Sequence, residues 1–105
     1  MFVKVSILMS CYNSQATISK SVESILSQSY EDIELLICDD GSIDDTYKTI
    51  EEYSKADKRI SIFKNEKNIG LTKSLNILIN KSDGEFIDRQ DDDDISLEQR
   101  IENQI

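Results

Sequence analysis

Four short apolar runs, each rich in β-branched or aromatic residues, predict four strands. They occupy residues 3–9, 33–40, 59–65 and 85–88. The second run, IELLICDD, is almost continuously apolar up to its two aspartates, as expected of a strand that is covered on both faces. The pattern therefore predicts a sheet that lies inside the molecule.

The segments between the runs carry apolar residues at helical spacing. This spacing predicts a helix over about 15–28, a second over about 43–57, and a loop followed by a third helix within 68–84. The expected apolar faces are Ile18, Val22, Ile25 and Leu26, then Ile43, Tyr47, Ile50 and Tyr53, then Leu71, Leu75, Leu78 and Ile79. A further helical pattern begins near residue 95 and continues to the last residue.

Strands that alternate with helices at this spacing imply right-handed crossovers and a mainly parallel sheet. The predicted fold class is α/β, with helices on both faces of the sheet in the order βαβαβαβα. Polar clusters SCYN, DDGS and DDDD follow the first, second and fourth strands. Because ligands in such sheets bind beyond the carboxyl ends of the strands, we expect these three clusters to meet at one edge.

Composition narrows the class of protein. The 105 residues suffice for one domain, and 21 acidic against 12 basic residues give a net charge of −9, which argues against a nucleic acid partner. No apolar run approaches the length of a membrane span, and no leader pattern is present, so we expect a cytoplasmic protein. Cys11 and Cys38 are too few for a disulfide framework or a zinc site, and we expect reduced thiols.

The run of four aspartates, residues 91–94, is the feature that most needs a chemical account. The sequence has no histidine, which excludes Ser-His and Cys-His nucleophilic schemes and imidazole metal sites. Crowded carboxylates must take up protons or hold a cation, and Mg²⁺ or Mn²⁺ with phosphate oxygens suits them. The alternative is that Asp93 or Asp94 caps the helix that begins near residue 95.

Other candidate residues also have a purely structural interpretation. The DDGS segment fits a turn followed by a helix cap. Tyr12 fits a half-buried aromatic residue on a turn, and Lys73 fits a solvated charge on a helix. The position of DDGS and Tyr12 near the expected edge is what makes them candidates for ligand binding.

Four ordered segments resemble a known family. VSILMSCYN, SILSQSYEDIELLICDDGSIDDT, NEKNIGLTKSLN and GEFIDRQDDDDIS are similar to the Rossmann-like N-terminal half of family 2 glycosyltransferases, which have the GT-A fold. The resemblance spans residues 5–100. It implies a domain that binds a nucleotide-diphosphate sugar and holds a divalent metal, Mn²⁺ or Mg²⁺, on an acidic D-x-D motif.

The resemblance also implies roles for individual residues. Ser10, Cys11 and Tyr12 would border the nucleobase, and Tyr12 would present an aromatic face to it. Asp40 would accept a hydrogen bond from a base N–H, and Asp39 would support that loop.

The D-x-D motif is matched by Asp91, Asp92 and Asp93. Asp93 would ligate the metal, and Asp91 or Asp92 would contact the ribose or a metal-bound water; Asp91 is also a candidate metal ligand. The middle residue of this motif is often small, whereas here it is Asp92. Many family members also carry Ala-Arg-Asn where this sequence has Ser74, Leu75 and Asn76, and Lys73 would then supply the basic contact to the nucleotide.

The resemblance further implies what the chain does as part of a longer enzyme. We expect residues 1–105 to be a donor-binding domain whose acceptor-binding half and general base lie elsewhere, with little or no transferase activity alone. The full enzyme would be an inverting transferase that moves a sugar, from a UDP-sugar, to a glycan or lipid-linked acceptor in polysaccharide biosynthesis, at the inner face of the membrane.

Two other classes of protein share parts of this pattern. A sugar-nucleotide nucleotidyltransferase would have a glycine-rich loop after the first strand, and SCYNSQAT has no glycine. A non-enzymatic flavodoxin-like receiver domain would take its acidic pair from the end of the first strand, which here ends in SCYN. A dinucleotide-binding Rossmann domain would need G-x-G-x-x-G, which is absent.

Overall fold

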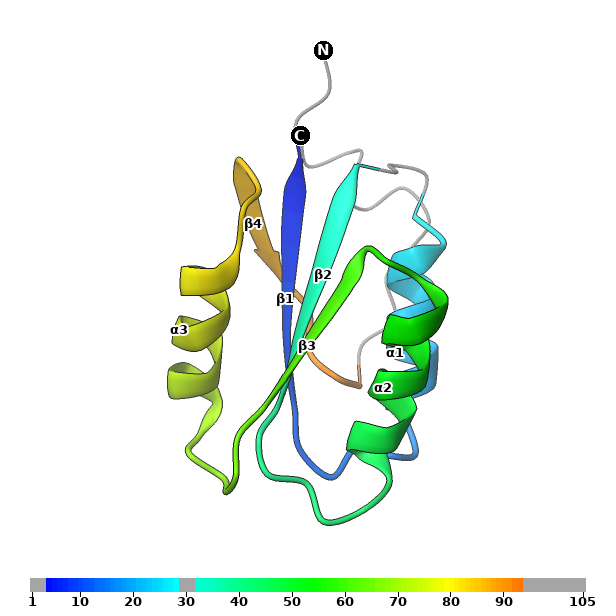
Figure 1. Ribbon diagram of the computed structural model, residues 1–105, viewed down its shortest axis with the longest axis vertical. Helices are drawn as coiled ribbons and strands as arrows, with labels where there is room; N and C mark the ends of the chain where they lie inside the picture. Colours follow the sequence, from blue (N-terminus) through cyan, green and yellow to red (C-terminus); the bar gives the residue numbers. More distant parts are fainter. Residues whose placement is uncertain (1–3, 29–31, 94–105) are drawn as a thin grey trace.

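The computed structural model describes residues 4–28 and 32–93 of the chain. In this part of the chain, four strands alternate with three helices (Figure 1). They are β1 (Val5–Cys11), α1 (Ile18–Leu26), β2 (Ile33–Asp39), α2 (Thr46–Ala56), β3 (Ile60–Lys64), α3 (Leu71–Lys81) and β4 (Phe86–Arg89). The helix predicted after residue 94 lies outside the described residues.

The strands form one sheet in the order β3-β2-β1-β4, and every neighbouring pair is parallel. α1 and α2 cover one face of the sheet, and α3 covers the other, as Figure 1 shows. The predicted α/β fold with helices on both faces is therefore confirmed. All strands point their carboxyl ends toward the same edge, which is where the polar clusters were expected.

The two faces of the sheet have separate apolar cores because successive residues of a strand point to opposite faces. The face under α1 and α2 buries Val5, Ile7 and Met9 of β1 against residues such as Ile18 and Ile50. The face under α3 buries a smaller cluster, which consists of Leu8, Leu36, Cys38 and Leu78. Burial on both faces explains why β1 and β2 read as nearly continuous apolar runs.

The helices are shorter than predicted at their amino ends. α1 begins at residue 18 rather than 15, and α2 begins at residue 46 rather than 43. The prediction that Ile43 belongs to the apolar face of α2 is wrong, because Ile43 precedes the helix and is 90% exposed. Leu71 and Ile79 of α3 are also about half exposed, so Leu78, with partly buried Leu75, carries the contact between α3 and the sheet.

Both cysteines are free and buried. Cys11 belongs to the core under α1 and α2, whereas Cys38 belongs to the core under α3. The sheet separates the two side chains, so they have no geometry for a disulfide. Burial raises the pKa of Cys38 above its ordinary value.

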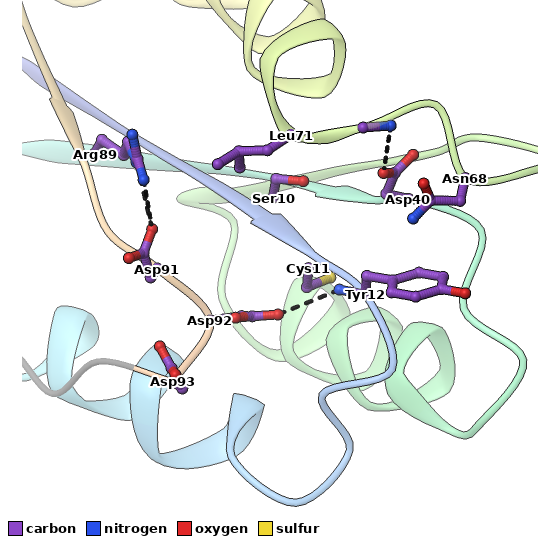
Figure 2. A pocket seen from close by; sticks show the side chains of 11 residues that line it. Ser10, Cys11, Tyr12, Asp40, Asn68, Leu71, Arg89, Asp91, Asp92 and Asp93 are labelled. Atoms are coloured by element: carbon purple, nitrogen blue, oxygen red, sulfur yellow. Dashed lines mark hydrogen bonds and ion pairs between the residues drawn. The ribbon is translucent and has the colours of Figure 1, made fainter.

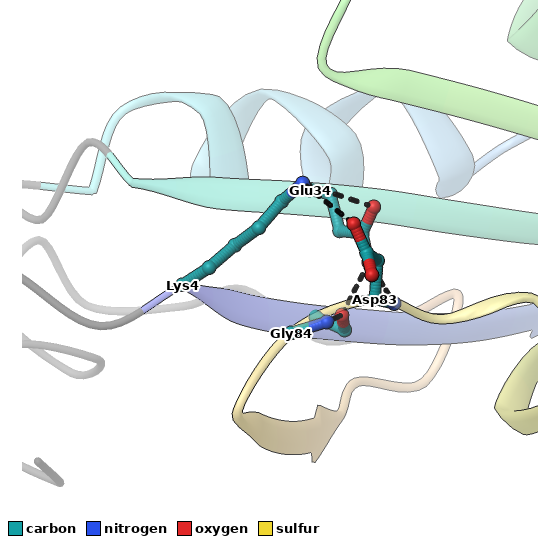
Figure 3. A network of polar contacts seen from close by, with 5 residues as sticks. Lys4, Glu34, Asp83 and Gly84 are labelled. Carbon is teal, nitrogen blue, oxygen red and sulfur yellow. Dashed lines mark hydrogen bonds and ion pairs between the residues drawn. The ribbon is translucent and has the colours of Figure 1, made fainter.

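A polar network at the opposite edge of the sheet fixes where β4 begins (Figure 3). Glu34 accepts hydrogen bonds from the Ser6 hydroxyl and from the Asp83 N–H, and the Lys4 ammonium lies 3.7 Å from its carboxylate. The Gly84 N–H donates to Ser6 Oγ at 2.7 Å. A Cβ on Gly84 would lie 2.6 Å from the Ser6 backbone nitrogen, so the close approach of this turn to β1 requires glycine.

No helix within residues 4–28 and 32–93 is long and apolar enough to cross a membrane.

Candidate functional site

A cleft of about 510 Å³ opens at the carboxyl edge of the sheet. It is lined by the end of β1, the loop after β2, the start of α3 and the segment that follows β4 (Figure 2). The lining residues are Ser10, Cys11, Tyr12, Asp40, Asn68, Gly70, Leu71, Arg89, Asp91, Asp92 and Asp93. The three polar clusters therefore meet at one edge, as the strand order predicts.

Tyr12 and the acidic segment are held together directly. The Tyr12 N–H donates a hydrogen bond to Asp92 Oδ2 at 3.2 Å, across 80 residues of sequence. The backbone carbonyls of the same segment are also engaged: Thr17 Oγ1 donates to Asp92 O at 3.1 Å, and Ser21 Oγ donates to Asp91 O at 3.0 Å. The Tyr12 side chain remains 48% exposed, so its ring is available to a ligand in the cleft.

The loops that follow β1 and β2 interlock through reciprocal hydrogen bonds. The Asn13 N–H donates to Ser42 Oγ at 2.8 Å, and Asn13 Oδ1 accepts from the Ile43 N–H at 2.9 Å. Gln15 Oε1 accepts from the Asp45 N–H at 3.1 Å. Asn13 has a φ of 47°, in the left-handed region that asparagine tolerates better than most residues. The interlocked loops fix the position of Tyr12, the residue directly before Asn13.

Asp40 is almost fully buried, and its carboxylate organises the loop before α3. It accepts hydrogen bonds from the Ile69 N–H at 2.8 Å, the Gly70 N–H at 3.0 Å and Asn65 Nδ2 at 3.0 Å. Burial alone would raise the pKa of Asp40, but these donors outweigh it, and the pKa lies below its ordinary value. Asp40 therefore lies in the wall of the cleft as an ionised group that already has three donors.

Asp39 lies behind this wall, next to Cys11, which is part of it. Asp39 is fully buried and accepts a hydrogen bond from the Ser42 hydroxyl of the loop that follows β2. Cys11 Sγ lies 3.8 Å from Asp39 Oδ1. Burial, together with the charges of Asp39 and Asp92, strongly raises the pKa of the Cys11 thiol. Cys11 is therefore a neutral wall residue at neutral pH and not a nucleophile.

The acidic end of the cleft contains one arginine. Arg89 pairs with Asp91 through Nη2 at 3.1 Å and Nε at 3.3 Å from the same carboxylate oxygen. Gln90, between them, is buried and donates from Nε2 to Ser21 Oγ at 2.9 Å. Because side chains alternate along an extended segment, the inward Gln90 leaves Arg89 and Asp91 facing the cleft.

The carboxylates of Asp91, Asp92 and Asp93 have the chemistry of a divalent metal site. Within residues 4–28 and 32–93, no three acidic or other ligating side chains already form a preassembled metal cluster. Mg²⁺ and similar ions commonly take only one or two protein carboxylates and complete their shell with water and substrate phosphates. The donor set therefore fits a metal that binds together with a phosphorylated ligand. The competing assignment, a cap by Asp93 or Asp94, involves a helix outside the described residues.

Most of the predicted site residues share the cleft. Those that line it are Ser10, Cys11, Tyr12, Asp40, Asp91, Asp92 and Asp93. Asp39 lies behind the wall, and Lys73 is exposed on α3 and is not part of the lining. The sequence analysis missed Asn68, Gly70, Leu71 and Arg89. Arg89 had a usable signal, since it directly follows the strand predicted over residues 85–88 and stands two residues before Asp91.

Comparison with known sequences identifies the family. The profile of Glycosyl transferase family 2 matches residues 6–105. A putative glycosyltransferase of Bacillus subtilis (strain 168), EpsE, is 43% identical over 103 residues, which are 97% of this chain and 37% of the relative. The Escherichia coli protein WfgD, named a UDP-Glc:alpha-D-GlcNAc-diphosphoundecaprenol beta-1,3-glucosyltransferase, is 42% identical over 96% of this chain and 39% of its own length. The chain thus spans well under half the length of these relatives.

Solved structures show the same fold. The structure of S. aureus TarS 1-349 in complex with UDP-GlcNAc is 26% identical and has a TM-score of 0.89, over 96% of this chain and 30% of that one. The mannosyltransferase PcManGT from Pyrobaculum calidifontis, in complex with GDP-Man and Mn²⁺, has a TM-score of 0.83 at 20% identity, over 89% of this chain and 28% of that one, and shows the fold alone. The fold is that of GT-A glycosyltransferases, and the chain belongs to glycosyltransferase family 2.

Proposed function

We propose that the cleft binds a nucleotide-diphosphate sugar, a UDP-sugar, together with Mn²⁺ or Mg²⁺. The observation that carries the proposal is that Tyr12 and Asp91, Asp92 and Asp93 line one cleft and are joined by the Tyr12 N–H to Asp92 hydrogen bond. An aromatic face suits a nucleobase, and neighbouring carboxylates suit a metal-bound diphosphate. The UDP-GlcNAc bound by TarS supports the choice of UDP.

We assign different residues of the cleft to the base, the metal and the ribose. Tyr12 stacks on the base, while Ser10 and Cys11 border it. The resemblance gives Asp40 a base N–H as its partner; because its carboxylate already accepts three hydrogen bonds, we propose that Asp40 instead holds the loop of Asn68 and Gly70 against the base. Asp93 and Asp91 would hold the metal, and Asp92 would meet the ribose. The chemistry supplied by a bound divalent ion is Lewis-acid stabilisation of charge on the diphosphate leaving group.

We propose sugar transfer for a longer protein of which this chain is one part. We assign to this chain the donor-binding domain of an inverting glycosyltransferase that uses a glycan or lipid-linked acceptor. The diphosphoundecaprenol in the name of WfgD supports a lipid-linked acceptor. Such an acceptor also fits a cytoplasmic location at the inner face of the membrane. Because we expect the general base and the acceptor-binding part to lie elsewhere in the longer protein, we expect little or no sugar transfer by the 105-residue chain alone.

Calorimetric titration of UDP, GDP and dTDP into the chain, each with and without Mn²⁺, tests the donor site. We expect UDP to bind in a metal-dependent way, and Asp93→Asn to weaken this binding at least about tenfold, because it removes a charged metal ligand. Asp32→Asn is the matched control, because Asp32 is exposed at the opposite edge of the sheet. Equal UDP affinity with and without Mn²⁺, or an Asp93→Asn variant that binds UDP as well as the control, would contradict the metal assignment.

A further inference from the structure

Arg89 is the single cationic side chain among the described residues that line the cleft, which also contains four carboxylates. Asp40 already accepts three N–H donors from the loop before α3, so its charge is stabilised without Arg89. The three aspartates that follow β4 have fewer partners of this kind. Arg89 therefore offsets about one of the three negative charges that Asp91, Asp92 and Asp93 bring to this end of the cleft.

The ion pair between Arg89 and Asp91 is open to solvent. The Arg89 side chain is 54% exposed and that of Asp91 is 48% exposed, and both contacts reach the same carboxylate oxygen. Exposed pairs of this kind stabilise a protein by roughly 0–1 kcal/mol. Arg89 can therefore leave Asp91 at little cost when a better partner enters the cleft.

The backbone on which Arg89 stands is fixed even though the side chain is not. Arg89 ends β4, where it is paired in register with Leu8 of β1, and the next residue, Gln90, donates its N–H to Leu8 O at 3.1 Å. The buried Gln90 side chain holds the same point against α1. A guanidinium on a rigid strand end stays at the cleft whether or not it is paired to Asp91.

We propose that Arg89 is a diphosphate-binding residue that exchanges Asp91 for the phosphate oxygens of the incoming nucleotide. This inference rests on the proposed function. The planar guanidinium matches phosphate oxygens in a two-point geometry, which it does not achieve with Asp91 in the free protein. A divalent ion held by Asp91 and Asp93 would offset their charge without Arg89. The Arg89 guanidinium would then be available to the diphosphate, which brings further negative charge.

Titration of UDP and of uridine, each in the presence of Mn²⁺, into Arg89→Met tests the exchange. We expect UDP binding to weaken by about tenfold to a hundredfold, the value of a lost charged hydrogen bond, and uridine binding to stay unchanged. We also expect Mn²⁺ alone to bind Arg89→Met more tightly than the unsubstituted chain, because Asp91 is released. Arg89→Lys should recover part of the UDP affinity, because it keeps the charge but not the planar fork.

Arg59→Met is the matched control. Arg59 pairs with Asp57 at the same two-residue spacing, but it stands before β3 at the opposite edge of the sheet. Its removal should leave UDP affinity unchanged. Circular dichroism and thermal unfolding of each variant show whether the fold is retained.

The outcomes separate the two proposals. UDP bound equally by Arg89→Met and the unsubstituted chain would overturn the role of Arg89 and leave the donor site intact. Equal losses for UDP and uridine would also overturn it, since they indicate a general effect on the cleft rather than lost phosphate contacts. If the unsubstituted chain binds none of the nucleotides, the donor site itself is wrong, and the inference about Arg89 falls with it.

Discussion

The Asp40 side chain determines the conformation of the loop that forms one wall of the cleft. Its carboxylate gathers the Ile69 and Gly70 N–H groups and the Asn65 amide, and so places the loop that contributes Asn68 to the cleft. Only an ionised carboxylate can accept from all three donors without presenting a donor of its own. The residue type follows from the three N–H groups that converge on it.

Asp40→Asn should lower the free energy of unfolding at pH 7 by about 1–3 kcal/mol, because the new amide must turn a donor toward a backbone N–H. The native pKa of Asp40 lies below its ordinary value of 3.8, so the carboxylate stabilises the fold above that pH and loses this effect as the pH falls through the native pKa. Urea denaturation from pH 7 to pH 3 should therefore show the gap between the two proteins narrow below about pH 4. A gap that is constant with pH would contradict the role of the charge.

For single residues, the sequence predicts whether a residue lines the cleft better at strand ends than on helices. Tyr12 directly follows β1 and Asp91 stands two residues after the end of β4, and the fold brings such positions to the cleft whatever the exact strand bounds are. Lys73 depends on the rotation of α3, in which Leu71 meets the cleft and Ser74 is buried, so a residue between them turns away. The basic residue that lines the cleft is Arg89, on a strand.

At the scale of elements, the order and type of every described helix and strand could be predicted, but the starts of α1 and α2 could not. Helical periodicity is carried by apolar residues, and it continues into segments such as that of Ile43. The backbone there bonds instead to side chains of the neighbouring loop, as in the contacts of Asn13 and Gln15. Such bonds between residues about 30 positions apart compete with the first helical turn and leave no local pattern.

Asn13→Ala should loosen the interlocked loops and so displace Tyr12. We expect the free energy of unfolding to fall by about 1–2 kcal/mol and UDP affinity to fall severalfold, since Asn13 both accepts a backbone N–H and occupies a left-handed conformation. Asn80→Ala is the control, because Asn80 is exposed on α3. Chemical denaturation and calorimetry measure the two effects. An Asn13→Ala variant that matches the control in both would contradict the positioning role.

At the scale of the whole molecule, a net charge of −9 opposes the compact state, and cations should relieve this repulsion. Two salts at the same ionic strength of roughly 0.15 M, NaCl and MgCl₂, screen exposed charges to a similar extent. We expect a higher melting temperature in MgCl₂, because ion binding at Asp91 and Asp93 adds to screening. This extra rise should be smaller in Asp93→Asn, and an equal rise in both salts would argue against a specific site.

The hydrogen bond between Tyr12 and Asp92 can form only late in the synthesis of the described chain. Its two residues are 80 positions apart, so at about 5–20 residues per second a ribosome needs roughly 4–16 s to make the second after the first. Once β2 has been made, β1, an inner strand of the finished sheet, has only β2 beside it and exposes the edge that β4 will cover. The cleft is thus the last part of the described chain to be completed, and the nascent protein carries an open strand edge until the acidic segment arrives.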